Sequence, residues 1–101
     1  MTTFEELKQT AGHDAAMRLI QARGGSRFTF PTKASGSILE GIVGKDAAQM
    51  LCEQFGGDYL DIPIAHRELA VWLHQQGWSL DRIACALRRT RRSVQRWTAR
   101  A

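Results

Sequence analysis

Apolar residues recur at the spacing of an amphipathic helix in two stretches of the first two-thirds of the chain. The stripes consist of Ala16, Leu19 and Ile20 in the first stretch and of Ala48, Leu51, Cys52 and Phe55 in the second. Capping boxes predict a shorter helix before each stretch, because a Ser or Thr side chain there accepts from a free backbone amide. The boxes pair Thr3 with Glu6 and Ser37 with Glu40. A glycine is then expected to end each short helix, at Gly12 and Gly44.

Each longer helix is followed by a Gly-Gly pair and by a short segment in which apolar and polar residues alternate, as in a β-strand. Proline cannot donate to a β ladder, so Pro31 and Pro63 fit strand ends. A two-stranded ribbon is marginal alone, so the strands are expected to pair with each other, with a second chain, or with both. The apolar residues of one strand face, predicted to serve dimerisation, are Phe28, Phe30, Leu60 and Ile62.

The two stretches form an internal repeat at an offset of 32 residues. When residues 12–31 are aligned with residues 44–63, eight of the twenty positions are identical and the matches keep their order. The repeat predicts tandem helix-helix-strand units at 3–33 and 35–65. The Gly-Gly pairs are interpreted as helix C-caps, because a phosphate site would use the start of a helix. No G-K-[ST] sequence surrounds them.

Three short helices are predicted in the last third of the chain, with the last two arranged as a helix-turn-helix. A supporting helix over 67–76 ends before Gly77, a residue suited to the left-handed conformation that follows a helix. Ser79 and Thr90 are N-cap residues for the second and third helices, and the third runs from Arg91 to Ala99. The apolar positions of the three helices are Leu69, Trp72 and Leu73, then Ile83, Ala84 and Leu87, then Val94 and Trp97.

Together these patterns predict a mostly α fold with short β-strands, an α+β fold. Residues 1–64 are expected to form a tandem-repeat region that serves dimerisation. Residues 65–101 are expected to form the helix-turn-helix domain.

The side of the third helix opposite Val94 and Trp97 carries mostly arginines. Arginine presents two parallel N–H donors that fit a guanine edge or a phosphate. We therefore predict that this helix lies in the major groove of double-stranded DNA. The predicted base contacts are Arg91, Arg92, Gln95 and Arg96, and the predicted phosphate contacts are Arg88, Arg89, Thr90, Ser93 and Arg100.

The turn between the last two helices departs from the usual pattern. Arg88 stands where such turns usually have a glycine, and Arg89 stands where they usually have an apolar residue. Arginine can lay its methylene groups on the core and keep its charge in water, so the fold is expected to survive.

Charge is divided unequally along the chain, whose net charge is +4. Residues 66–101 contain eight arginines and two acids, a net charge of +6, whereas residues 1–65 have a net charge of −2. Such asymmetry is typical of an anion-binding domain beside a nearly neutral one.

Composition narrows the remaining classes of function. The 101 residues allow one compact unit or two small ones sharing a core, and no apolar run approaches the length of a membrane span. The N-terminus is acidic and is not expected to be a signal peptide, so a cytoplasmic location in a bacterial host is expected. Cys52 and Cys85 are expected to be core thiols, and the histidines lack the spacing of zinc ligands. No cofactor, metal or catalytic role is predicted; Asp14 and Asp46 recur with the repeat and are interpreted as structural.

The order of these elements resembles the Mor transcription-activator family of phage and prophage regulators. The resemblance covers AAMRLIQARGGSRFTFPTK (15–33), AAQMLCEQFGGDYLDIPIA (47–65) and GWSLDRIACALRRTRRSVQRW (77–97). It implies a dimerisation region built on the strands and a C-terminal domain whose last helix enters the major groove. Activation would also require a contact with RNA polymerase.

The leading hypothesis is accordingly a homodimeric, sequence-specific transcription regulator of phage or prophage type. One alternative is a DNA-binding accessory of packaging or recombination with little sequence preference. Another is a protein-interaction domain whose arginines meet an acidic partner.

Overall fold

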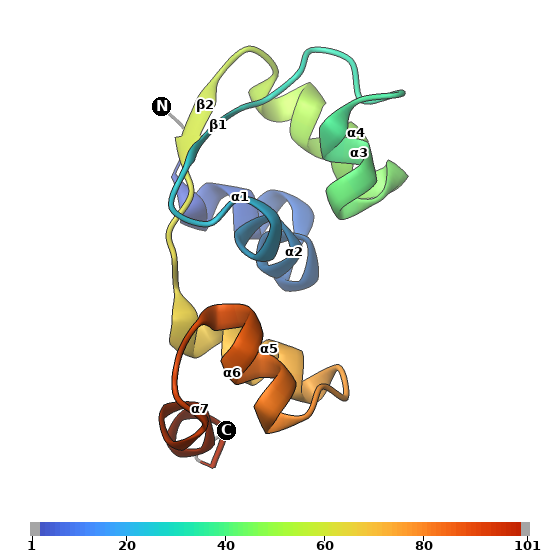
Figure 1. Ribbon diagram of the computed structural model, residues 1–101. Coiled ribbons are helices and arrows are strands. Elements are labelled where there is room, and N and C mark those ends of the chain that lie inside the picture. The colour runs from blue at the N-terminus through green and yellow to red at the C-terminus, as the bar shows by residue number, and fades with distance from the viewer. Residues whose placement is uncertain (1–2, 100–101) are drawn as a thin grey trace. The chain divides into compact units, whose positions relative to one another are not determined.

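A computed structural model describes residues 3–99 as mostly helical, with one two-stranded antiparallel sheet (Figure 1). This confirms the predicted α+β class at the level of its elements. The chain divides into two compact units, Met1–Ile64 and Ala65–Ala101, named unit 1 and unit 2 below. No helix among residues 3–99 is long and apolar enough to cross a membrane.

Unit 1 contains two helices and a strand, followed by the same three elements again. They are α1 (Phe4–Ala11), α2 (His13–Arg23), β1 (Arg27–Thr29), α3 (Ile38–Val43), α4 (Lys45–Phe55) and β2 (Tyr59–Asp61). Both predicted caps form: the Thr3 hydroxyl accepts from the Glu6 amide at 3.3 Å, and the Ser37 hydroxyl accepts from the Glu40 amide at 3.2 Å. The short helices end at Gly12 and Gly44, whose φ angles of 90° and 93° favour glycine.

The two strands pair with each other within the chain, so no second chain is needed to complete the ribbon. Arg27 lies opposite Asp61, and Phe28 lies opposite Leu60. The backbone hydrogen bonds around the ribbon occur in equivalent pairs, in which each residue of one half corresponds to the residue 32 positions away in the other half. The Gly25 and Gly57 amides donate to the Ile62 and Phe30 carbonyls at 2.8 and 2.9 Å, and the Ile62 and Phe30 amides donate to the Ser26 and Asp58 carbonyls, both at 2.8 Å.

The helices of unit 1 pack with the same equivalence between the two halves. Helix α1 contacts α2 and α4, and α3 contacts α4 and α2. Each short helix therefore packs against the long helix of its own half and against that of the other half. The consequence is an approximate internal two-fold axis that passes through the ribbon between Phe28 and Leu60.

The four strand residues predicted to serve dimerisation form part of the core of unit 1. Phe28, Phe30, Leu60 and Ile62 are all buried, and Phe30 is 1% exposed. The Phe30 ring lies 5.6 Å, centre to centre, from the rings of Phe28 and Phe55. In the single chain these side chains pack against their own unit and present no free apolar face; dimerisation itself stays a prediction.

The first glycine of each Gly-Gly pair allows a close approach of backbone. A Cβ atom on Gly24 would lie 2.7 Å from the Ile20 carbonyl oxygen and 3.3 Å from that of Pro63. A Cβ atom on Gly56 would lie 2.6 Å from the Cys52 oxygen and 3.4 Å from that of Pro31. Each Gly-Gly pair thus ends a long helix and lets the backbone at the end of the opposite strand pack close to it.

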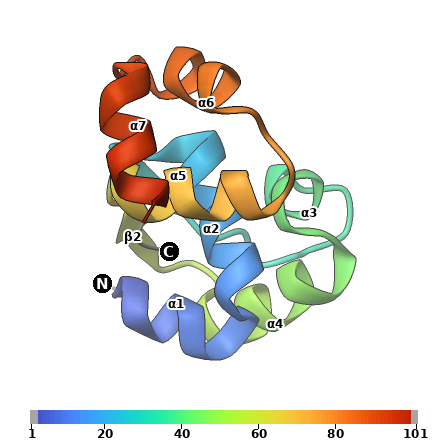
Figure 2. The same cartoon turned by 90° about the horizontal axis from the view of Figure 1, so that it is seen from below.

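Unit 2 consists of three helices that contact one another (Figure 2). They are α5 (His66–Gln75), α6 (Leu80–Leu87) and α7 (Arg91–Thr98). Among residues 65–99 the buried residues are Leu69, Ala70, Trp72, Leu73, Ile83, Ala84 and Val94. All of these except Ala70 belong to the predicted apolar positions, so the helical spacing located this core; Leu87 and Trp97 are half-buried.

The two cysteines differ in their surroundings. Cys52 is buried in α4, where desolvation raises the pKa of its thiol. Cys85 is exposed, so the expectation that it is a core residue is wrong. The buried stripe of α6 runs through Ile83 and Ala84, and because each residue turns the helix by about 100°, Cys85 lies about 200° from Ile83, on the side away from the stripe.

Candidate nucleic-acid interface

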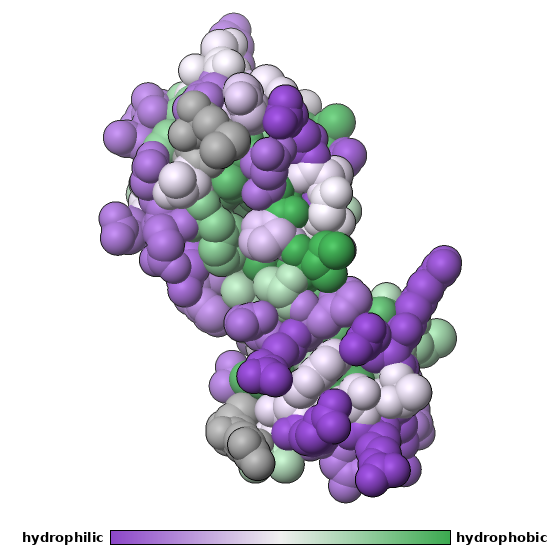
Figure 3. Space-filling model, turned by 90° about the vertical axis from the view of Figure 1, so that its left-hand side faces the viewer, coloured by the Kyte–Doolittle hydropathy of each residue, from purple (hydrophilic) through white to green (hydrophobic). Residues whose placement is uncertain are grey.

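Helix α7 presents its predicted base contacts to solvent. Val94 is fully buried and anchors the helix, whereas Arg91, Arg92, Gln95 and Arg96 are all exposed. These four residues form two pairs spaced four apart, so they lie along one side of the helix. Figure 3 shows hydrophilic side chains over much of the visible face of unit 2. The predicted reading residues are thus brought together on one accessible side.

The start of α7 is held by a side-chain cap. The Thr90 hydroxyl accepts from the Ser93 amide at 3.1 Å and lies 3.0 Å from the Ser93 hydroxyl. Both residues were predicted to contact phosphate. In the free chain their hydroxyls serve the cap, as Thr90 was expected to do, and Ser93 is half-buried. Arg100, another predicted phosphate contact, lies outside the described residues.

The turn before α7 forms with arginine in the position that glycine usually takes. Arg88 has φ 53° and ψ 43°, the left-handed conformation. Its amide donates to the Cys85 carbonyl at 3.3 Å, and the Arg89 amide donates to that of Ala84 at 3.0 Å. This pair of bonds is the Schellman motif that ends many helices.

The end of α5 has the same motif with a glycine. Gly77 has φ 94°, as predicted for the residue that follows this helix. The Gly77 amide donates to the His74 carbonyl at 3.0 Å, and the Trp78 amide donates to the Leu73 carbonyl at 3.1 Å. One unit therefore contains the same turn twice, once without backbone strain and once with an arginine that must bear it.

Two arginines of unit 2 lie over tryptophan rings. The guanidinium carbon of Arg82 is 3.8 Å from the centre of the Trp78 ring, and that of Arg89 is 5.6 Å from the centre of the Trp97 ring. Both arginines are exposed and both tryptophans are half-buried. Stacking on an aromatic face limits the conformations of a guanidinium while its N–H donors stay available at the edge.

Arg82 was missed in the sequence-based prediction of the interface. Its signal was its position four residues after Trp78, at the start of a helix.

An ion pair connects the first turns of α6 and α7. Arg91 Nε lies 3.2 Å from Asp81 Oδ1, and the two side chains are 65% and 81% exposed. The pairing of Arg91, a predicted base contact, was not anticipated. Asp81 and Glu68 are the acidic residues of 65–99, so Asp81 places a negative charge among the arginines.

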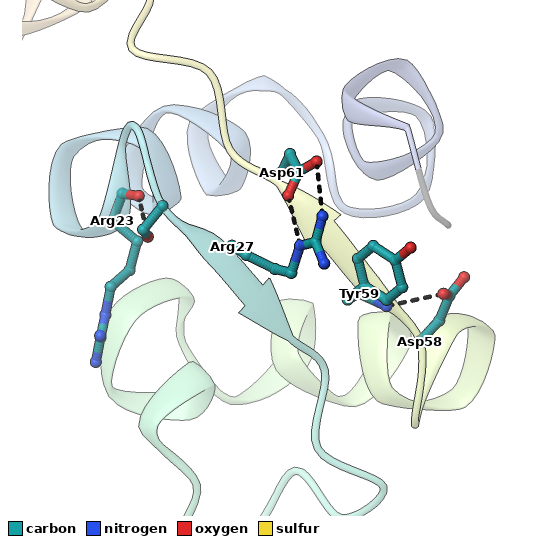
Figure 4. Close-up of polar contacts among 6 residues, drawn as sticks. Arg23, Arg27, Asp58, Tyr59 and Asp61 are labelled. Atoms are coloured by element: carbon teal, nitrogen blue, oxygen red, sulfur yellow. Dashed lines mark hydrogen bonds and ion pairs between the residues drawn. The ribbon is translucent and has the colours of Figure 1, made fainter.

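A second exposed ion pair lies on the ribbon of unit 1 (Figure 4). Arg27 Nε donates to Asp61 Oδ1 at 2.8 Å, and the guanidinium carbon is 4.4 Å from the centre of the Tyr59 ring. The hydrogen bond from Arg27 lowers the pKa of Asp61, and the carboxylate raises that of Arg27. The charge of Arg27 is thus compensated by Asp61, whereas no ion pair is described for Arg92 or Arg96.

A shallow hollow of about 420 Å³ lies between the first turns of α2 and α4. Its rim contains Asp14, Arg18, Lys45 and Asp46, charges of both signs. It therefore lacks the single sign of charge that selects an anion or a cation. Among residues 3–99 no group of three or more potential ligands could hold a metal ion.

Comparison with known proteins bears on unit 2. No curated protein and no solved structure matches the chain. Residues 65–101 match the model of a protein family described as "Putative ATPase subunit of terminase (gpP-like)". The matched segment begins at the boundary between the two units and contains α5, α6 and α7, so the arginine-bearing unit is the part of the chain that is similar to a phage terminase family.

Proposed function

We propose that this chain binds double-stranded DNA through unit 2 and serves phage DNA packaging in a bacterial host cell. The observation that carries the proposal is the match of residues 65–101 to the terminase family model. It supports the packaging alternative better than the transcription-regulator hypothesis, since no comparison points to a regulator.

The proposed DNA contact is a helix-turn-helix made of α6 and α7, with α5 as its support. The exposed side of α7 supplies Arg91, Arg92, Gln95 and Arg96 for base edges. Arg88 and Arg89, in the turn, and the stacked Arg82 supply phosphate contacts. The net charge of +6 over residues 66–101 supports a contact with DNA, because counterion release favours DNA at a surface of that sign.

No ATPase activity is proposed for the chain itself, although the matching family is described by that activity. The single Gly-Lys pair, Gly44-Lys45, is followed by Asp46, where a phosphate loop has Ser or Thr. The purified chain is expected to hydrolyse no ATP above background, with or without DNA.

A transcription regulator of the Mor type is the second candidate function. Its support is the sequence resemblance over residues 15–33, 47–65 and 77–97. The homodimer that reads an inverted repeat and the contact with RNA polymerase belong to this candidate.

Selection from a random duplex library by the purified full chain, at ~150 mM salt, tests both candidates. Binding without an enriched inverted repeat is the expected result and supports the packaging proposal. An enriched inverted repeat, with half-sites about one helical turn apart, would favour the regulator. Absence of binding to any duplex would contradict both and leave an acidic protein partner for the arginines. An Arg92→Ala, Arg96→Ala chain is the control for binding through α7.

A further inference from the structure

Asp81 is the feature of unit 2 that its proposed task does not explain. A carboxylate near a DNA-binding helix repels phosphate, and the other acid of residues 65–99, Glu68, lies on a different helix. Asp81 is the second residue of α6, and its partner Arg91 is the first residue of α7. Their ion pair therefore joins the starts of the two helices that form the proposed interface.

We infer that Asp81 is a specificity-determining residue of the DNA interface. It holds Arg91 in position for base edges and disfavours complexes in which Arg91 contacts only the phosphate backbone of the DNA. The inference rests on the proposed function but goes beyond it, because packaging does not by itself require that the chain prefer any sequence. It assigns a role to a residue that makes no attractive contact with DNA.

The position of the contact on the guanidinium supports a positioning role. Asp81 Oδ1 faces Nε, which carries one of the five N–H donors of an arginine. The remaining donors belong to the two Nη atoms, the pair that binds guanine through parallel hydrogen bonds. A carboxylate at Nε restricts the long side chain, so less conformational freedom is lost when the Nη atoms meet a base.

Charge explains the penalty on backbone contacts. If Arg91 leaves Asp81 to bind a phosphate, the carboxylate stays behind near the polyanion without its partner. If Arg91 reads a base edge while it remains beside Asp81, the negative charge stays compensated. The pair thus disfavours the first complex relative to the second, and specificity is the difference between the two affinities.

The test compares the full chain with its Asp81→Asn variant, which keeps the shape of the side chain and removes its charge. Binding is measured by fluorescence anisotropy on a mixed-sequence duplex and on the duplex best enriched from the random library. Asp81→Asn is expected to bind the mixed-sequence duplex about three- to fivefold more tightly, the upper part of the range measured for an exposed ion pair. Affinity for the enriched duplex is expected to change less than twofold, so discrimination falls.

Two control variants separate this role from a general effect of charge. Glu68→Gln removes the same charge from α5 and is expected to leave discrimination unchanged. In an Arg91→Gln background, Asp81→Asn is expected to have no further effect on discrimination, because the pair is already broken. Thermal unfolding of each variant shows whether the loss of an acid from the first turn of α6 changes stability.

Equal gains on both duplexes would overturn the role of Asp81, as would the same loss of discrimination in Glu68→Gln. The role would also be overturned if Asp81→Asn still reduced discrimination in the Arg91→Gln background, or if the wild-type chain bound DNA without any preference. In all these cases the chain still binds DNA, so the proposed function stands. A wild-type chain that binds no duplex would instead overturn the proposed function, and this inference with it.

Discussion

Arg88 combines two roles that favour different residues. Its left-handed backbone suits glycine, and its exposed side chain is a predicted phosphate contact. An L-residue in that conformation costs about 1–2 kcal/mol, part of which glycine returns through its freer unfolded state. The sequence indicated that the turn lacked its usual glycine, but only the backbone angles show that the turn formed anyway.

Arg88→Gly is therefore expected to stabilise the chain and to weaken DNA binding. The free energy of unfolding, measured with urea, should rise by up to about 1 kcal/mol. The salt dependence of DNA binding should become shallower by about one unit of slope, because one phosphate contact is lost. Lower stability would show that the Arg88 side chain contributes more to the fold than its backbone costs.

The glycines of unit 1 permit a matched comparison of two alanine substitutions. Gly56→Ala is expected to destabilise the chain by about 1–3 kcal/mol, because its Cβ would lie 2.6 Å from the Cys52 oxygen. Gly41→Ala, in α3 with open space around its Cβ position, is expected to stabilise by about 0.5–1 kcal/mol. Urea denaturation of both variants measures the difference; equal effects would contradict the close approach at Gly56.

Thiol reactivity should distinguish the two cysteines. Cys85 is exposed and is expected to react rapidly with a chromogenic disulfide reagent at neutral pH. Cys52 is expected to react only on unfolding, because it is buried and its raised pKa reduces the thiolate fraction. A Cys85→Ser variant identifies which thiol is fast, and two fast thiols in the native chain would argue against the burial of Cys52.

At the scale of the element, the pattern of residues predicted where the helices lie along the chain but not how two helices are oriented relative to each other. Helical spacing and capping residues predicted α6 and α7, and both side-chain caps form as expected. Spacing alone could not show that Asp81 meets Arg91, because that contact depends on the angle between two helices. The stacking of Arg82 on Trp78 lies within one segment and was open to prediction from a separation of four residues.

Substitutions on α7 and in the turn should separate base contacts from phosphate contacts. Arg96→Ala is expected to cost about 1–3 kcal/mol on an enriched duplex and to relax specificity. Arg89→Gln is expected to weaken all duplexes alike and to reduce the salt slope by about one unit. The same effect of both substitutions on every duplex would show that the division of roles is wrong.

At the scale of the whole molecule, the repeat in the sequence predicted two similar halves but left open how their strands pair. The alternation of residues is the same whether the partner strand belongs to one chain or two. The reciprocal bonds of Gly25 and Gly57 come from both halves of one chain. No property of a single segment could have shown that reciprocity.

A disulfide across the ribbon tests pairing within the chain. Thr29 and Tyr59 are opposite, outward-facing residues in antiparallel strands, at a site suited to a disulfide. A Thr29→Cys, Tyr59→Cys variant, in a Cys85→Ser background, is expected to oxidise to a cross-linked chain of monomer mass on a non-reducing gel. A covalent dimer at micromolar concentration would indicate strands exchanged between chains. The singly substituted chains are the control.

The approximate two-fold axis of unit 1 has a consequence for the number of chains that bind one DNA site. One chain contains two equivalent halves in unit 1 but a single α7, so its internal symmetry does not extend to the arginine-bearing helix. A palindromic site presents the same half-site twice, and one chain could occupy only one of them. Palindromy in a bound sequence would therefore report the number of chains on the DNA, not the symmetry already built into each chain.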